Sequence, residues 1–354
     1  MNDKNILLKV KDLKKDYLRT KGALRKKVVG IVKAVDKINL FIREGETLGL
    51  VGESGCGKTT TGRCILRAIE PTSGEIIFKM NNNSEPINMA SLDKDELKKI
   101  RKNMAMIFQD PYSSLNPRMT ILEIVAEPFV IHKITTKRGE LRERVSTLLK
   151  MARLDPAYMD RYPHAFSGGQ RQRVAIARAL ALRPKFIVAD EPVSALDVSM
   201  QAQVLNLLIE LQQKLHLTYL FIAHNLAVVK YVSDRVAIMY VGKIVELAST
   251  EELFTNPKHP YTEALLSAVP KADPRYKKKK VLLAGDIADP ANPPSGCYFH
   301  PRCRYAKEIC KGKEPPLINN SGGGDEHAHY VACHFKDKLK LVGIERKLKL
   351  INKK

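Results

Sequence analysis

The sequence contains no hydrophobic run long enough to cross a membrane. A helix that spans a bilayer needs about 18 or more uninterrupted apolar residues. The best candidate, residues 174–190, is interrupted by three basic residues, Arg178, Arg183 and Lys185. The first residues also lack an apolar secretion segment, because charged side chains recur over residues 3–15. We therefore expect the protein to stay in the cytoplasm.

Acidic residues are scarce relative to basic ones. The chain has 38 Asp and Glu against 60 Lys and Arg, which gives a net charge of +22 and a pI near 9.7. This balance favours anionic partners, either nucleic acid or the anionic inner leaflet of a membrane. A lysine-rich, well-solvated surface would have the same composition, so charge alone does not choose between these readings.

Cysteines are also few, and they are unevenly placed. Of the six, two lie in the first quarter, and four lie near the end of the chain: Cys297, Cys303, Cys310 and Cys333. In a cytoplasmic chain, clustered cysteines suggest metal binding more than disulfides. Their spacing lacks the CxxC pair that is common in structural zinc sites. Four thiolates across an irregular loop suit a [4Fe–4S] cluster or Zn²⁺.

Two other readings of the cysteine cluster stay open at this point. Four histidines lie close in sequence, so a mixed Cys/His zinc site is possible with some of His300, His327, His329 and His334. The cysteines could also be four reduced thiols in a small core. So short a segment buries little apolar surface alone, which favours a metal that holds it together.

Strand-like and helix-like segments alternate along most of the 354 residues. This pattern predicts an α/β fold with a central, largely parallel sheet. The apolar runs predict strands at residues 47–51, 186–189 and 219–223, and helices at residues 59–69 and 201–214.

Between residues 111 and 163 the strand signal disappears, and residues 141–151 and their surroundings look helical. We therefore expect an inserted helical subdomain at about residues 111–168. The composition changes again near residue 270, where a lysine run at 277–280 and a Pro-rich stretch at 289–294 predict a linker. The predicted domains are residues 1–270, which carry the core, and residues 271–354, a small module with the four cysteines, a loop at 319–324 and a basic tail.

A phosphate-binding loop follows the first predicted strand. The segment Gly52-Glu53-Ser54-Gly55-Cys56-Gly57-Lys58-Thr59 has the P-loop pattern between a strand and a helix. Its glycines let backbone N–H groups and the helix N-terminus face a β-phosphate. By average residue usage such a pattern arises by chance on the order of once in a hundred chains of this length. Lys58 is expected at the β/γ-phosphates and Thr59 at Mg²⁺, with Cys56 contributing only backbone.

Two carboxylates end the predicted strand at residues 186–189. Asp190 and Glu191 follow an apolar run, where an acidic pair is otherwise costly at the edge of a core. A solvated acidic pair is common when taken alone, but an upstream P-loop makes it the lesser reading. Asp190 is then expected to hold Mg²⁺ through water, and Glu191 to act as the general base for the attacking water.

Further motifs identify a family. Ser167-Gly168-Gly169-Gln170, with Phe166 before it, resembles the signature motif of ABC ATPases. In that family the signature faces the nucleotide held by the P-loop of another subunit, which implies a dimer that encloses two ATP molecules. Four more positions resemble family elements in the family's order: Tyr17 on the adenine, Gln109 of the glutamine loop, Asp197 of the D-loop and the switch histidine His224.

The resemblance also implies a set of site residues. Catalysis is expected from Glu191, Lys58, His224 and Gln109. The nucleotide is expected to contact Tyr17, Gly52, Ser54, Gly55, Cys56, Gly57, Lys58, Thr59, Thr60, Gln109, Ser167, Gly168, Gly169, Gln170, Asp190 and Asp197. Of these, Thr59, Gln109 and Asp190 are expected around Mg²⁺. The long interval between Tyr17 and the P-loop predicts a basic insertion between Leu18 and Val32.

A closer likeness is to the F-type ATPase subunits of oligopeptide and dipeptide permeases. It rests on the stretches at residues 106–117, 194–199, 259–262 and 292–297, and it extends to about Cys333. Ala165 departs from the pattern, since relatives usually carry Glu there. Some F-type relatives lack the glutamate at the position of Glu191, so its presence implies a site competent for hydrolysis.

That likeness implies a function and partners. The expected function is ATP-driven import of oligopeptides or dipeptides, at the cytoplasmic side of the cell membrane. The implied partners are a D-type ATPase subunit, two transmembrane permease subunits and an extracytoplasmic peptide-binding protein, and the likeness favours [4Fe–4S] for the cysteines. Nickel or another small solute is the alternative cargo.

An ABC ATPase that acts on nucleic acid is the rival from another class, and it fits less well. Chromosome-type heads need a long coiled coil, whereas the interval at residues 62–165 is short and interrupted by prolines. Translation-type proteins carry two motif sets, and this chain has one. We therefore expect no nucleic-acid partner.

Overall fold

The computed structural model describes residues 5–21, 27–80, 84–269, 281, 283–321 and 328–344. Parts of four predicted features lie outside these residues: the basic insertion at 22–26, the lysine run at 277–280, the loop from 322 onward together with His327, and the basic tail from 345.

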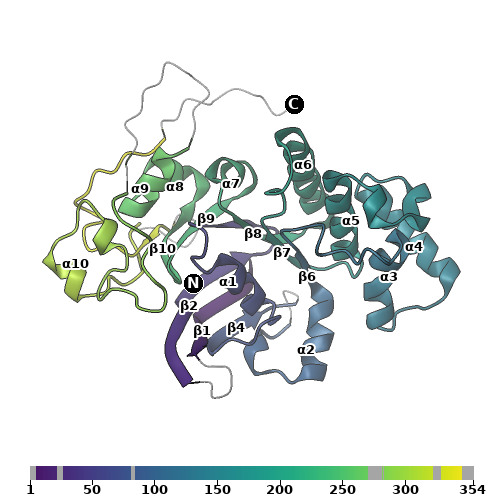
Figure 1. Cartoon of the computed structure of the whole chain (residues 1–354), viewed down its shortest axis with the longest axis horizontal. Helices are drawn as coiled ribbons and strands as arrows, with labels where there is room; N and C mark the ends of the chain where they lie inside the picture. Colours follow the sequence, from purple (N-terminus) through teal and green to yellow (C-terminus); the bar gives the residue numbers. More distant parts are fainter. Residues whose placement is uncertain are drawn as a thin grey trace.

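The main sheet has eight strands in the order β11-β12-β10-β9-β3-β8-β7-β6 (Figure 1). In chain order these are β3 (Thr47–Val51), β6 (Met104–Ile107), β7 (Phe186–Asp190), β8 (Thr218–Ala223), β9 (Arg235–Tyr240), β10 (Lys243–Ser249), β11 (Ile318–Asn319) and β12 (Tyr330–Val331). The central strands β6, β7, β8, β3 and β9 are parallel neighbours. The three predicted strands are confirmed, and they lie in this parallel part.

A second, antiparallel sheet packs beneath the first helix. It consists of β1 (Ile6–Lys21), β2 (Lys27–Arg43), β4 (Ser73–Phe78) and β5 (Ile87–Asn88), in the order β2-β1-β4-β5. β1 and β2 form a long hairpin in which Tyr17 pairs with Val32. The described part of the predicted basic insertion therefore extends these two strands.

Helices lie around the two sheets (Figure 1). They are α1 (Lys58–Ile65), η2 (Met89–Ser91), α2 (Lys94–Ile100), η3 (Arg101–Asn103), α5 (Gly168–Leu180), α6 (Val198–Leu215), α7 (Leu226–Val232), α8 (Thr250–Thr255) and α9 (Pro260–Ser267). The helix predicted at 201–214 is confirmed as part of α6. The helix predicted at 59–69 is too long, because α1 ends at Ile65. Arg67 adopts a left-handed φ of 51°, which an α-helix cannot continue through.

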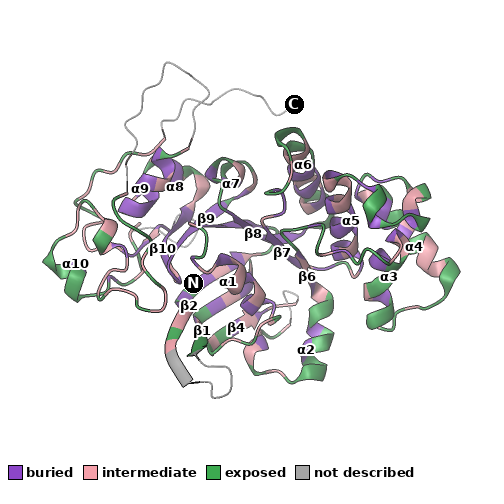
Figure 2. Ribbon diagram, in the orientation of Figure 1, coloured by how far each residue is buried: buried purple, intermediate pink, exposed green. Residues whose placement is uncertain are grey.

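The predicted helical subdomain forms one end of the molecule. The described residues 111–168 contain α3 (Ile121–Ile131), α4 (Arg138–Met151), η4 (Pro156–Asp160) and η5 (Pro163–Ala165), and no strand. A capping box between Thr120 and Glu123 starts α3. Buried residues of α3, α4 and α5 join one core with the upper face of the sheet (Figure 2).

The last described part of the chain lies at the opposite end. It contains η6 (His300–Arg302), α10 (Glu308–Gly312), β11 and β12. β12 pairs with the edge of the main sheet, with Glu246 of β10 opposite Val331. The cysteine-bearing segment is therefore joined by strand pairing to the sheet that carries the P-loop (Figure 1).

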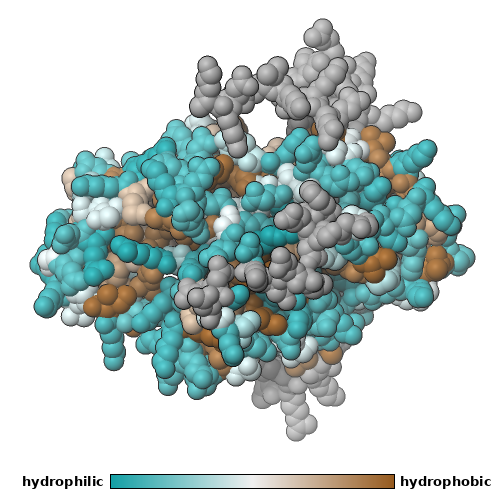
Figure 3. All heavy atoms as spheres, turned by 180° about the vertical axis from the view of Figure 1, so that it is seen from behind, coloured by the Kyte–Doolittle hydropathy of each residue, from teal (hydrophilic) through white to brown (hydrophobic). Residues whose placement is uncertain are grey.

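The face seen in Figure 3 is largely hydrophilic, with scattered hydrophobic patches. Among the described residues, no helix combines the length and the apolar character that a membrane crossing requires.

Candidate functional site

The P-loop is built so that two of its glycines cannot be replaced without a backbone clash. It starts after β3, whose five residues are all buried. A Cβ on Gly52 would lie 2.1 Å from the carbonyl oxygen of Met239, and one on Gly57 would lie 2.1 Å from that of Ala34. Gly57 also has a φ of 106°, which favours glycine. The loop therefore passes close to neighbouring backbone, as a phosphate cradle requires.

Lys58 lies inside this loop. Its Nζ donates to the carbonyl oxygens of Gly52, at 2.8 Å, and Glu53, at 3.0 Å. The side chain is buried, and the loop's own backbone holds the ammonium group at the start of α1. Burial raises the pKa of the neighbouring Cys56 thiol, so Cys56 is a buried, protonated packing residue. Ser54 and Gly55 are exposed at the mouth of the loop.

The predicted magnesium ligands meet at the end of β7. The Thr59 hydroxyl donates to Oδ1 of Asp190 at 2.9 Å. Asp190 is 1% exposed, and this burial raises the pKa of its carboxyl group. A hydroxyl and a carboxylate side by side are oxygen donors of the kind that Mg²⁺ prefers. The two residues fit the ion that the sequence predicts for them.

Glu191 lies at the centre of the predicted catalytic residues. Its Oε2 accepts from Nε2 of Gln109 at 3.0 Å and lies 3.2 Å from Nδ1 of His224. Gln109 follows β6 and His224 follows β8, so strands on both sides of β7 deliver these side chains. Because parallel strands end at one edge of a sheet, ligands and catalytic groups gather there.

The backbone of Glu191 is in an uncommon conformation. Its φ is 45°, in the left-handed region, and its N–H donates to the Ile222 carbonyl at 3.0 Å. A non-glycine residue in this region costs on the order of 1–3 kcal/mol, and such strain concentrates at functional sites. The turn places the carboxylate between Gln109 and His224 instead of continuing the strand.

The signature segment is a capped helix start. Ser167 is the N-cap of α5, and its hydroxyl and the side chain of Gln170 form a capping box. A Cβ on Gly169 would lie 2.0 Å from Cε of Met200, and one on Gly168 would lie 3.3 Å from Leu196. The two glycines therefore pack on the D-loop and on α6.

Asp197 and the glutamine loop complete the surroundings of the signature. Asp197 caps α6 by accepting from the Met200 N–H at 2.9 Å. The Arg171 guanidinium lies 4.1 Å from the centre of the Tyr112 ring. This contact joins α5 to the segment that follows Gln109.

The structure does not bring the signature to the P-loop of its own chain. Among the described residues, Ser167, Gly168 and Gly169 form no hydrogen bond with residues 52–59. Figure 1 shows α5 and α1 well apart. Tyr17 lies on the β1–β2 hairpin, is 39% exposed, and has the Lys15 ammonium 5.0 Å from its ring centre. An exposed ring of this kind is available for stacking.

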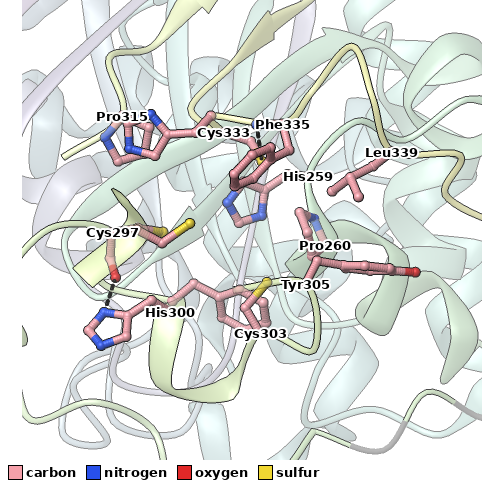
Figure 4. Close-up of a pocket in the computed structure, with 13 residues that line it drawn as sticks. His259, Pro260, Cys297, His300, Cys303, Tyr305, Pro315, Cys333, Phe335 and Leu339 are labelled. Atoms are coloured by element: carbon pink, nitrogen blue, oxygen red, sulfur yellow. Dashed lines mark hydrogen bonds between the residues drawn. The ribbon is translucent and has the colours of Figure 1, made fainter. Parts of the chain in front are cut away.

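The four clustered cysteines line a single small cavity of about 20 Å³. Figure 4 shows Cys297, Cys303 and Cys333 around it, with the ring of His259 among them. Burial, reinforced by the other thiols, raises the pKa of Cys297 to about 12 and that of Cys333 to about 11. Within the described residues, no three Cys, His, Asp or Glu have the arrangement that holds one metal ion.

The histidines divide between this cavity and other places. His300 and His334 line the cavity, but their rings contact the carbonyls of Cys297 and Lys313 at 3.0 and 2.8 Å. His329 instead pairs with the buried Glu246 at 2.7 Å. Sequence reasoning missed His259, which belongs to a stretch singled out only for its family likeness. It also missed Arg302 and Tyr261, which contact the P-loop residue Glu53. Their separation from it in sequence leaves no local signal.

Comparisons with known proteins show the family of the chain. The family model described as ABC transporter matches residues 35–194, and the one described as oligopeptide/dipeptide transporter, C-terminal region, matches residues 245–310. The chain is 50% identical to the oligopeptide transport ATP-binding protein AppF of Bacillus subtilis, over 93% of this chain and 97% of AppF.

Solved structures resemble the core. The dimeric structure of MJ0796, a bacterial ABC transporter cassette, has a TM-score of 0.59 and 33% identity, over 69% of this chain and 99% of that one. The structure of cbiO1 from Clostridium perfringens has a TM-score of 0.58 and 28% identity, over 71% and 91%. The chain therefore belongs to the ABC transporter ATPases, in the group of ATP-binding subunits that carry the oligopeptide/dipeptide transporter C-terminal region.

Proposed function

We propose that this ATPase energises the import of oligopeptides or dipeptides across the cell membrane. The observation that carries the proposal is the convergence of Gln109 and His224 on Glu191, beside the Thr59–Asp190 pair, in a chain that is half identical to an oligopeptide transport ATP-binding protein. One chain thus supplies the proposed base, the residues that orient it and the proposed magnesium ligands.

The P-loop residues bind the nucleotide. Backbone N–H groups of Ser54 to Thr60, at the start of α1, face the phosphates, and Tyr17 stacks on the adenine. Lys58 exchanges its contacts with the Gly52 and Glu53 carbonyls for phosphate oxygens. Thr59, Asp190 and Gln109 hold Mg²⁺, which when bound offsets the charge on the phosphate oxygens.

Glu191 is the general base of the hydrolytic step. It accepts the proton of the attacking water, and the carboxylate is already oriented by Gln109 and His224. His224 is exposed enough to move toward the γ-phosphate. Positioning and charge stabilisation by Lys58 then supply most of the remaining catalysis.

A second subunit completes the site. The signature residues Ser167, Gly168, Gly169 and Gln170, with Asp197 behind them, bind the nucleotide held by the partner. We propose a D-type ATPase subunit as this partner, with two permease subunits docked near Gln109 and residues 111–117, and an extracytoplasmic peptide-binding protein. The chain then works at the cytoplasmic face of the membrane as a peripheral subunit.

The decisive experiment is reconstitution. The tagged chain is purified from membranes with its associated subunits, which are identified and placed in proteoliposomes. We expect ATP-dependent accumulation of labelled oligopeptide on the side of the membrane that carries the ATPase pair, and none with the Lys58→Ala chain. Transport of nickel without transport of any peptide would overturn the proposed cargo.

We further propose that Cys297, Cys303, Cys310 and Cys333 hold a [4Fe–4S] cluster. Supporting this, all four line one cavity. Four cysteine thiolates are the usual ligand set of a [4Fe–4S] cluster. Anaerobically purified chain should contain four iron and four sulfide, on the order expected for one cluster. One zinc and no iron would refute it.

A further inference from the structure

Glu53 carries a negative charge within the phosphate-binding loop, and Arg302 holds that charge. The guanidinium donates to Oε2 of Glu53 at 2.7 Å and to Oε1 at 3.2 Å, although the two residues are 249 positions apart. The Arg302 side chain is 7% exposed and that of Glu53 is 24% exposed. Paired hydrogen bonds in a partly buried setting make this one of the stronger kinds of ion pair.

The rest of Glu53 is also fixed by contacts. Its backbone N–H donates to the Tyr261 hydroxyl at 3.0 Å, and its carbonyl accepts from Lys58 at 3.0 Å. Tyr261 is fully buried, and its ring lies 5.3 Å from that of Phe299. Phe299 and Arg302 both belong to the segment between Cys297 and Cys303. Two contacts therefore run from the cysteine segment to the same P-loop residue, one directly and one through Tyr261.

Electrostatics give the ion pair a consequence for nucleotide binding. The loop must bind the negative charges of a polyphosphate, and a carboxylate within it opposes that binding at short range. The Arg302 guanidinium offsets this charge and keeps the side chain of Glu53 turned toward the C-terminal segment. Without Arg302, an unpaired carboxylate would stand beside the phosphates and be free to compete for the Lys58 ammonium.

We propose that Arg302 is a positioning residue for ATP binding, through which the four-cysteine segment sets the nucleotide affinity of the P-loop. The proposal rests on the P-loop being the ATP site. It assigns the C-terminal segment a role in the ATPase cycle in addition to any role in holding a metal.

The test measures MgATP affinity of the full chain by titration calorimetry. Arg302→Gln should weaken binding on the order of tenfold, which corresponds to about 1.4 kcal/mol. Glu53→Gln should bind at least as tightly as the wild type, and the double variant should recover most of the lost affinity, because the repelling charge is then gone. In the assembled complex, Arg302→Gln should raise KM for ATP while kcat stays within about twofold.

Arg304→Gln is the matched control. Arg304 lies in the same segment and pairs with Glu263 at 3.0 Å, but it is half exposed, and within the described part of the chain it forms no ion pair with the P-loop. Its affinity should equal that of the wild type. Thermal unfolding checks the fold of each variant, and Arg302→Lys, which keeps the charge, should bind more tightly than Arg302→Gln.

Three outcomes would overturn the inference. The first is an unchanged affinity in Arg302→Gln. The second is a double variant, Arg302→Gln with Glu53→Gln, that binds MgATP more weakly than Glu53→Gln by the same factor by which Arg302→Gln binds more weakly than the wild type. The third is an equal loss in Arg304→Gln. Failure of the wild-type chain to bind MgATP would instead refute the P-loop as the ATP site, so the two failures are distinguishable.

Discussion

At the scale of single residues, the carboxylate of Glu191, the proposed general base, is closely constrained. A left-handed backbone aims it, and Gln109 and His224 hold its Oε2 from two sides. A base that is already oriented loses little entropy when water binds, which is how positioned groups contribute to catalysis. An amide has nearly the same shape as a carboxylate, so we expect Glu191→Gln to keep the fold.

Glu191→Gln should abolish proton acceptance and leave ATP binding intact. We expect ATP hydrolysis by the assembled complex to fall at least about 100-fold, the lower range of what a general base contributes. The variant should also accumulate as an ATP-bound dimer in size-exclusion chromatography. Glu210→Gln, which removes a partly exposed carboxylate of α6 that pairs with Arg153 and Lys214 away from the candidate site, serves as the control. Undiminished hydrolysis by Glu191→Gln would show that another group is the base.

Asp190 gives a second prediction at this scale, based on pH. Burial raises the pKa of its carboxyl group, so the folded chain binds this proton more tightly than the unfolded chain. The resulting stability is fully present below about pH 4 and is lost as the pH rises through the folded-state pKa. Asp190→Asn should remove this loss. Thermal unfolding is measured without Mg²⁺ or nucleotide. The melting temperature of Asp190→Asn should rise relative to that of the wild type as the pH increases, whereas a difference that does not change with pH would contradict the prediction.

The structure brings together several of the residues that the motifs predicted for the site, for a physical reason. Gln109 and His224 follow β6 and β8, Asp190 is the last residue of β7, and Thr59 lies at the start of α1, which follows β3. Neighbouring parallel strands end at one edge of the sheet. Once the strands were predicted, the meeting of their flanking side chains followed. The Arg302–Glu53 pair could not be predicted in this way, since neither residue belongs to a motif that implies the other.

At the scale of elements, the P-loop before α1 contains two glycines that are required for different physical reasons. Gly55 and Gly57 both have positive φ values, 78° and 106°. A Cβ on Gly55 meets nothing within 4 Å, whereas one on Gly57 meets the Ala34 backbone. An alanine at position 55 would therefore suffer conformational strain alone. One at position 57 would also clash with the β1–β2 hairpin.

Gly57→Ala should damage the protein more than Gly55→Ala. We expect Gly55→Ala to cost about 1–2 kcal/mol, the strain of a left-handed alanine, and to retain measurable ATP binding. Gly57→Ala must also displace the backbone of β2 or of the loop, so ATP binding should be lost. Denaturant unfolding and MgATP titration of both variants measure this. Equal effects of the two substitutions would show that packing against Ala34 is unimportant.

The end of α1 shows a limit of sequence reasoning about elements. The apolar pattern continues to Ile69, but the helix stops at Ile65 because Arg67 turns into a left-handed conformation. There its guanidinium donates to the carbonyls of Met89 and Leu92. These acceptors come from a segment more than twenty residues away, so hydrophobic periodicity could not reveal the stop.

At the scale of the whole molecule, a different part of the chain is attached at each edge of the main sheet. The helical subdomain extends from the β6 edge, and the cysteine segment adds β11 and β12 to the other edge. Sequence reasoning predicted both parts from changes in composition. It could not predict that β12 pairs with β10, because strands of two residues leave almost no pattern. The boundary proposed near residue 270 thus separates segments that share one sheet.

The separation of α5 from α1 leads to the last prediction. Because Ser167 forms no hydrogen bond with residues 52–59 of its own chain, all of which the structure describes, Ser167→Arg should leave MgATP binding by the isolated chain unchanged. It should abolish hydrolysis at the site where this chain's signature covers the nucleotide of its partner, since a bulky cation at the helix start blocks closure. Lys58→Ala should instead lose binding and hydrolysis together. MgATP titration and steady-state hydrolysis of both variants test this. A Ser167→Arg chain that loses binding as severely as Lys58→Ala would place the signature and the P-loop in one and the same chain's site.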